Sequence, residues 1–156
     1  MKLGEALAVR ADAARRVEQL QARIVASARF QEGEKPAEDA KALLAEAAQA
    51  LDQLEQMIRR INRTNAAAVV GSQGTITDAL ARRDTLRLRH ALLTAAADAA
   101  AGKNRPGAVR QLRSELKMLS ALPVSRLRAE ADVIARDLRE LDVRLQQSNW
   151  EVELLD

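Results

Sequence analysis

The chain has 156 residues, an apolar share of 47% and a formal net charge of +3. That length fits one domain with its own core, and an apolar share made mostly of alanine and leucine favours helices. Because there is no cysteine, disulfides, thiolate metal sites and thiol nucleophiles are excluded, and a reducing compartment such as the cytoplasm is expected. Charges recur every few residues, so neither a signal peptide nor a membrane span is predicted.

The first predicted helix covers about residues 3–30. Residues that suit a buried face recur there at steps of three and four, which is the helical period. They are Leu3, Ala6, Val9, Ala13, Val17, Leu20, Ile24 and Ser27. Gly33 can close this helix and Pro36 fits the first turn of the next, so the sequence predicts a short connection between antiparallel helices.

The second predicted helix covers about residues 37–65 and has the pattern of a coiled coil. Its apolar residues alternate in steps of four and three, which gives a heptad seam of about three repeats. The seam residues are Ala40, Leu44, Ala47, Leu51, Leu54, Ile58 and Ile61. Asn65 would occupy the next seam position, where a polar residue either fixes the register or marks the end of the helix.

A small β element is predicted after the second helix, near residues 66–76. Two short β-favouring runs flank Gly71 and Gly74 there, which indicates a hairpin. The third helix then covers about residues 77–101, and its apolar residues lie on more than one face, so it is expected to pack on two sides.

The second half contains two further strand candidates and one regular helix. Residues 114–121 favour a short strand, although the leucine spacing there would also suit a helix. The last helix, about residues 124–148, repeats the three-and-four spacing of the second. Residues 150–154 alternate between apolar and acidic side chains and are a possible further strand.

The fold class predicted from these elements is mainly α, an antiparallel helical bundle forming one domain over residues 1–156. Acidic residues outnumber basic ones from Glu32 to Glu55, and basic residues dominate from Arg59 to Lys117. We interpret this asymmetry as complementary faces that pack within the chain or against a symmetry mate. The heptad seams and the many-faced third helix together predict a homo-oligomer.

Several stretches together resemble a known bacterial family. They are MKLGEAL, QEGEKPAEDAKALL, INRTN, TITDALARRDTLRLR, RSELK and LDVRLQQSNWEVELL, in this order. Through these stretches the chain resembles the uncharacterised family often labelled septicolysin-like. The resemblance implies a mostly helical cytoplasmic protein with a minor β element and no established activity. The label suggests a pore-forming cytolysin, but narrow apolar seams opposite dense charge are not typical of lipid-facing segments.

The first candidate binding site lies at the end of the second helix, where Asn62, Arg63, Thr64 and Asn65 are consecutive. Two amides, a hydroxyl and a guanidinium can hold a small anion. The same groups can instead cap the helix and satisfy carbonyl groups of the following turn, which is the interpretation that we favour.

The second candidate site is the run ARRDTLRLRH in the third helix. Its basic residues are Arg82, Arg83, Arg87, Arg89 and His90, around Asp84. Such a cluster could bind phosphate groups or nucleic acid. The favoured alternative is ion pairing with acidic residues, because an arginine on an apolar seam must be paired to be buried.

The sequence contains no catalytic motif, and no metal or cofactor site is predicted. Its single histidine, His90, does not define a metal site or a catalytic base. The function predicted is therefore a self-associating structural or interaction protein without a membrane partner. Nucleic-acid or anion binding through the third helix is the alternative, and an enzymatic role is uncertain.

Overall fold

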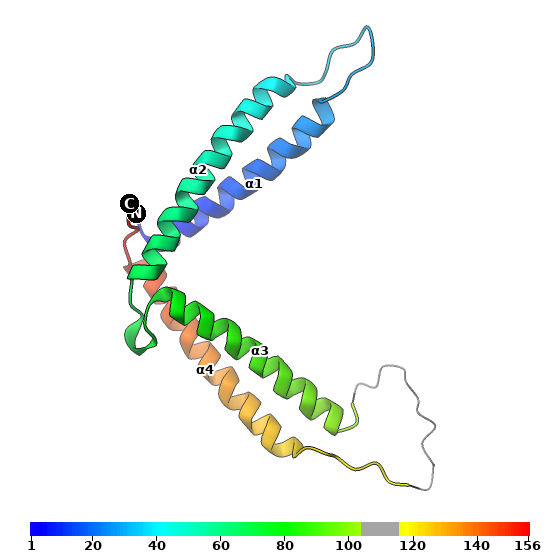
Figure 1. The fold of residues 1–156 in the computed structure, drawn as a ribbon, viewed down its shortest axis with the longest axis vertical. Coiled ribbons are helices and arrows are strands. Elements are labelled where there is room, and N and C mark those ends of the chain that lie inside the picture. The colour runs from blue at the N-terminus through cyan, green and yellow to red at the C-terminus, as the bar shows by residue number, and fades with distance from the viewer. Residues whose placement is uncertain (104–115) are drawn as a thin grey trace. The chain divides into compact units, whose positions relative to one another are not determined.

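The structure is a computed structural model that describes residues 1–103 and 116–156. The described residues are mainly helical, which confirms the predicted fold class (Figure 1). The helices are α1 (Leu3–Ser27), α2 (Ala40–Ala67), the 3-10 helix η1 (Gly71–Gln73), α3 (Ile76–Ala100) and α4 (Val124–Glu151).

Contacts between residues divide the chain into two compact units. The first comprises Met1–Ile76 with Gln146–Asp156, and the second comprises Thr77–Leu145. Helix α4 therefore contributes to both units. The single domain expected from the sequence stays a prediction, and each unit is described by itself.

The start of α2 is fixed by its N-cap residue. Asp39 Oδ1 accepts hydrogen bonds from the main-chain N–H groups of Lys41 at 2.9 Å and Ala42 at 3.3 Å. These are two of the four N–H groups that a helix leaves without internal partners at its start. At the start of α1, the Lys2 N–H donates to Glu5 Oε2 at 2.8 Å. Both helices thus begin where the sequence offers a carboxylate.

In the first unit α1 and α2 lie side by side (Figure 1). The core between them includes Leu20 of α1 with Leu43 and Ala50 of α2. Most of the seam predicted for α1 is buried or half-buried, but Val9 is exposed. Val17, Ile24 and Ala47 pack against this cluster and extend the core along the hairpin.

One flank of this hairpin is crossed by ion pairs. Arg16 of α1 pairs with Glu46 of α2 at 2.7 Å, and Arg23 pairs with Glu38 just before α2. Glu46 and Glu38, which both belong to the acidic stretch Glu32–Glu55, therefore pair with α1. The packing of the acidic stretch Glu32–Glu55 against the basic stretch Arg59–Lys117, suggested by the sequence, stays a prediction.

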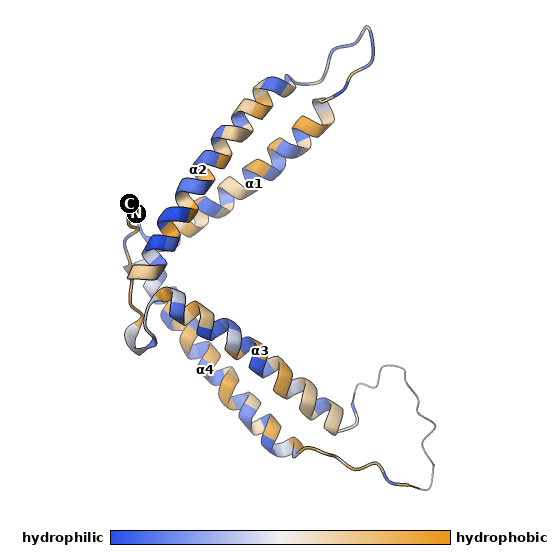
Figure 2. Ribbon diagram, in the orientation of Figure 1, coloured by the Kyte–Doolittle hydropathy of each residue, from blue (hydrophilic) through white to orange (hydrophobic). Residues whose placement is uncertain are grey.

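Four residues of the seam predicted for α2 are buried or half-buried, namely Ala40, Ala47, Leu54 and Ile61. The other three are displaced from the core by one residue. Leu43, Ala50, Ile61 and Thr64 are the buried residues of this helix. Leu44, Leu51 and Ile58 were predicted to face the core, but they are exposed by 56%, 50% and 37%. Two overlapping heptad rows exist in α2, and a step of one residue turns the helix by about 100°. Packing against α1 selects the row with the smaller Ala50. Figure 2 shows that hydrophilic and hydrophobic residues alternate along both helices.

The strand pair predicted near residues 66–76 is wrong. Only an isolated antiparallel bridge, Val69 to Thr75, is formed. Between these residues the chain makes the single 3-10 turn η1, and Val70 N–H donates to Gly74 O at 2.7 Å. Gly71 has a φ of 51°, in the left-handed region that glycine adopts without strain. The turn is too tight to leave residues for two strands.

The strand predicted over residues 150–154 is also corrected, because α4 continues to Glu151. Beyond it the chain forms one antiparallel bridge between Lys2 and Glu153. Next to the bridge, Leu3 N–H donates to Val152 O at 2.9 Å. The first residues of this alternating segment therefore complete α4, and the later ones form a single bridge instead of a strand.

Residues 116–121, predicted as part of a strand, form no regular structure. The rest of that prediction, residues 114–115, lies outside the described residues. The neighbouring prediction for α4 is confirmed, since its three-and-four row is buried or half-buried throughout. The row is Val124, Leu127, Ala131, Ile134, Leu138, Leu141, Leu145 and Ser148.

In the second unit α3 and α4 lie side by side (Figure 1). Ala79 and Ala97 of α3 are buried, as are Ile134 and Leu141 of α4. Ion pairs again cross one flank of the hairpin. They are Arg87 with Asp142 at 3.7 Å and Arg128 with Asp98 at 3.2 Å.

Candidate functional site: an arginine cluster and an arginine-lined groove

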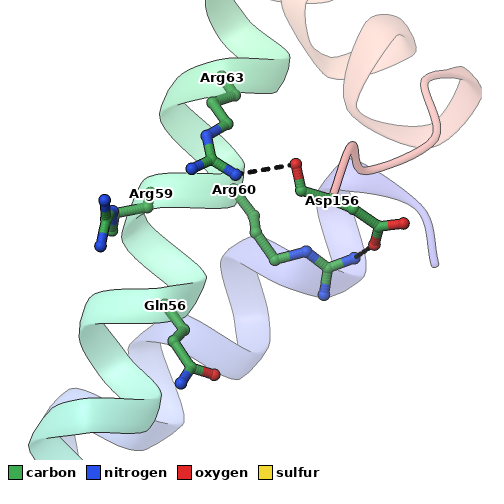
Figure 3. Close-up of a pocket in the computed structure, with 5 residues that line it drawn as sticks. All are labelled: Gln56, Arg59, Arg60, Arg63 and Asp156. Carbon is green, nitrogen blue, oxygen red and sulfur yellow. Dashed lines mark hydrogen bonds and ion pairs between the residues drawn. The ribbon is translucent and has the colours of Figure 1, made fainter.

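The first candidate site lies in the first unit, where arginines of α2 hold the last residues of the chain (Figure 3). Arg60 Nε donates to Leu155 O at 3.0 Å, and Arg60 Nη2 donates to Asp156 Oδ1 at 2.8 Å. Arg63 Nη1 donates to Asp156 O at 3.0 Å. A guanidinium has several donors in fixed directions, so Arg60 can hold a carbonyl and a carboxylate together.

Thr64, on the buried side of α2, also holds the segment that follows α4. It has no exposed surface. Its Oγ1 donates to Arg60 O at 2.8 Å and accepts from Leu155 N–H at 3.0 Å. A hydroxyl can do both at once, which an apolar side chain of the same size could not. Thr64 therefore joins α2 to the segment that follows α4.

A shallow pocket of about 380 Å³ lies over these arginines. Gln56, Arg59, Arg60, Arg63 and Asp156 line it, and in Figure 3 the Arg59 guanidinium points away from Asp156. Arg59 pairs with Glu55 at 3.4 Å. Each arginine of the pocket thus has an acceptor in the chain, and the arrangement is suited to anchoring rather than to binding a free anion.

The predicted residues of this site have different roles. Arg63 takes part in the attachment, as described. Asn62 is exposed and Asn65 is half-buried. The structure gives neither amide a hydrogen bond to any described residue. Thr64, which lies between them on the buried side of α2, was noted in the sequence as a cap, and its long-range partner could not be seen there.

The second candidate site divides over two sides of α3. Arg83 Nε and Nη2 both donate to Asp84 Oδ1 at 3.2 Å. Arg87 pairs with Asp142 of α4, and His90 is half-buried on the same side of the helix as Arg83. Arg83 is among the least exposed arginines of the helix and is paired, as expected of an arginine near a seam.

Arg82 and Arg89 lie on the other side of α3 and line a groove of about 790 Å³ between α3 and α4. We call it the α3/α4 groove. Its apolar lining includes Leu86, Leu92, Leu93, Val133 and Ile134, and its other charged residues are Arg126, Glu130 and Asp137. Leu92 and Val133 are exposed. The arginine-rich run therefore supplies two cations to an apolar groove and uses two others within the chain.

The charges of the α3/α4 groove are only partly paired. Arg126 Nε donates to Glu130 Oε1 at 3.3 Å. Arg82, Arg89 and Asp137 make no ion pair with any residue that the structure describes. Asp137 was missed as a site residue, because it lies on α4, far from the arginines in sequence. Only the antiparallel packing of α3 and α4 brings it to the same groove.

Two kinds of feature are absent from residues 1–103 and 116–156. Within these ranges no group of three or more histidine or acidic side chains could hold a metal ion. Across the same part of the chain, no helix combines the length and the apolar character needed to cross a membrane.

The described residues thus form a mainly helical protein built on two helical hairpins, with an arginine-lined groove on one of them. The chain belongs to a family of unknown function, DUF6847, which matches residues 10–154. It is also similar to a protein of known structure described as a functionally unknown conserved protein from Corynebacterium diphtheriae. That relative is 35% identical over 99% of both chains, with a TM-score of 0.86. No curated protein matches the chain.

These comparisons agree with the absence of an established activity that the resemblance implied. Both the family and the protein of known structure are described only as functionally unknown. Neither description carries the septicolysin-like label.

Proposed function

We propose that this protein is a self-associating interaction protein. The observation that carries the proposal is the exposed row Leu44, Leu51 and Ile58, which we call the α2 stripe. Its residues are seven apart, and a spacing of seven keeps side chains on one face of a helix over several turns. An uncovered heptad row of large apolar residues is typical of a helix that packs against another one.

The layout of the hairpins supports the same proposal. Each hairpin has one flank crossed by ion pairs, Arg16 with Glu46 in the first and Arg128 with Asp98 in the second. The opposite flank of each exposes large apolar side chains. A hairpin of two helices buries one seam only, so an additional apolar flank needs a partner from elsewhere. We propose that the partner is a second copy of the chain.

Light scattering and sedimentation over a series of micromolar concentrations would test this proposal. We expect the mass to be a multiple of 17.1 kDa. Leu51→Glu should shift the protein toward monomer with unchanged helicity, because a charge would have to be buried. Gln53→Glu, on the other flank of α2, is the matched control and should leave the mass unchanged. A wild-type monomer at all concentrations would exclude self-association.

Anion or nucleic-acid binding through α3 is the second candidate function. In its favour, Arg82 and Arg89 have no ion-pair partner among the described residues and share one groove. Against it, Arg83 and Arg87 are paired, and Asp137 lies in the same groove. Anisotropy of labelled mixed-sequence DNA and RNA at low salt would measure binding. Loss of a signal in the Arg82→Glu/Arg89→Glu variant, with helicity unchanged, would support this function.

We further propose the cytoplasm as the site of action, since a chain without cysteine suits a reducing compartment. A lytic activity, as the septicolysin-like label suggests, would be detected as release of dye from lipid vesicles. We expect none, because in each hairpin arginines and acids cross one flank.

A further inference from the structure

The α3/α4 groove combines exposed apolar side chains with charges of both signs. Arg82 and Arg89 on α3 and Asp137 on α4 line it without pairing to any described residue. Leu92 and Val133 are the large apolar residues exposed there. From Arg82 to Leu93 the groove follows α3 for roughly 16 Å at 1.5 Å per residue, enough to seat three turns of a helix.

The charges restrict what can occupy this groove. A nucleic acid or an anionic lipid headgroup presents negative charge only, and the unpaired carboxylate of Asp137 would repel it. An acidic peptide would satisfy the arginines and leave Asp137 without a cation. The occupant that fits must therefore offer both apolar surface and both signs of charge.

The opposite flank of the same hairpin shows that the chain places acids to match its own arginines. Arg87 has Asp142 as its partner, and Arg128 has Asp98. On the groove flank, by contrast, Arg89 and Asp137 both line the groove without meeting. The groove thus carries the two halves of an ion pair that the single chain does not form.

We propose that the α3/α4 groove binds the same groove of a second copy, with Arg89 of each copy pairing with Asp137 of the other. This rests on the proposed self-association and adds the α3/α4 groove to the α2 stripe as a second contact surface. A twofold axis pairs residue i with residue j and j with i, so one arginine and one acid in the groove give two ion pairs. Leu92 and Val133 of the two copies then cover each other. Arg89 and Asp137 then each find a partner of opposite sign, as burial of a charge requires.

Charge reversal on the full-length protein tests the pairing. With Arg89→Glu, positions 89 and 137 are both acidic in each copy, so like charges face each other across the interface. With Asp137→Arg, both positions are cationic in each copy, with the same effect. Each variant alone should weaken the dimer by about tenfold or more, because close interfacial charge pairs contribute at least about 1.5 kcal/mol. An equimolar mixture of the two variants should recover a heterodimer, since each copy then supplies what the other lacks. The double variant in one chain should recover a homodimer for the same reason.

The matched control variants carry the same charge reversals at positions outside the groove. Arg139→Glu and Asp132→Arg lie on exposed positions of α4 that do not line the groove. Both should dimerise as the wild type does, and circular dichroism should show equal helicity in all variants. Sedimentation equilibrium measures each dissociation constant.

The outcomes separate this inference from the proposed function. If the wild type is a monomer, both are wrong. If the wild type associates and Arg89→Glu does so equally well, the groove is not the surface, and the α2 stripe remains the one to test. If both reversals weaken the dimer but their mixture does not restore it, the pairing of Arg89 with Asp137 is overturned.

Discussion

The main-chain N–H of Leu155 donates a 3.0 Å hydrogen bond to the hydroxyl of Thr64, 91 residues earlier in the chain. The same hydroxyl donates to the carbonyl oxygen of Arg60 at 2.8 Å. One buried side chain thus satisfies a donor of the segment after α4 and an acceptor of α2. Arg60 and Arg63 hold the next residue, Asp156, from the exposed side.

Thr64→Val should destabilise the protein by about 1–3 kcal/mol, because it keeps the volume and leaves the Leu155 N–H without a partner. Urea denaturation followed by circular dichroism would measure the change. Thr85→Val is the control: Thr85 is exposed and bonds only to carbonyl groups of its own helix, so about 0.5 kcal/mol or less is expected. Equal losses for the two variants would argue against a special role for Thr64.

Leu43 and Leu44 are adjacent on α2, yet they are 5% and 56% exposed. Leu43→Ala removes core volume next to Leu20 and should cost about 2–4 kcal/mol. Leu44→Ala should cost less than about 1 kcal/mol in the monomer. The pair is best compared by thermal unfolding at low protein concentration, where association contributes least. The opposite order would mean that α2 faces α1 with the heptad row predicted from the sequence.

Gly4 lies against the end of α4. A Cβ atom added there would lie 3.1 Å from Asn149 O and 3.5 Å from the Trp150 ring. Gly4→Val should therefore destabilise the protein by about 1–3 kcal/mol, although valine is a better helix former than glycine. Ala8→Val, at an exposed position of the same helix, carries only the propensity cost of about 0.5 kcal/mol. Denaturant titration of the two variants measures the difference.

The ion pair between Arg23 and Glu38 should make stability depend on pH. The side-chain hydrogen bond from Arg23 lowers the pKa of Glu38 below its usual value. A carboxylate with a lowered folded-state pKa adds stability above its unfolded pKa, and this stability is lost as the pH falls through the folded-state value. Glu38→Gln should thus be less stable than wild type at neutral pH and equal to it in acid.

An Arg23→Gln background provides the control for this pH dependence. In that background the substitution Glu38→Gln should leave the stability unchanged at every pH, because the guanidinium that stabilises the carboxylate is gone. Urea midpoints measured across the acidic range would report it. A difference that persists at low pH would show that Glu38 acts by packing and not by its charge.

The sequence was sufficient for the helices and for two of the buried rows. In α1 and α4 the three-and-four row identified by periodicity is the face that becomes buried, apart from Val9. In α2 two heptad rows overlap, one through Leu43 and one through Leu44, and periodicity alone cannot choose between them. The choice depends on the fit of Ala50 against Leu20, which is a property of the packed pair. The predictions of short strands were wrong, because alternation over a few residues does not distinguish a strand from an isolated bridge, which needs only one residue on each side.

The candidate sites were predicted in part, for a similar reason. The basic run in α3 is visible in the sequence, and a turn of about 100° per residue separates Arg82 and Arg89 from Arg83. Which side is paired depends on the acids that α4 brings alongside, such as Asp142. Asp137 joins the groove only through that packing. Likewise, nothing near Thr64 in sequence indicates that Leu155 is its partner.

The discontinuous first unit has a consequence for synthesis on the ribosome. Its α1 and α2 emerge first, but the residues that hold α2 through Thr64, Gln146–Asp156, emerge only after the whole of the second unit. The second unit, Thr77–Leu145, is continuous in sequence and can form as soon as it leaves the exit tunnel. The early hairpin must therefore wait, with α2 unanchored, until the second unit has been synthesised. Ribosome-bound chains shortened before residue 146 should leave this first hairpin sensitive to protease, and the full chain should protect it.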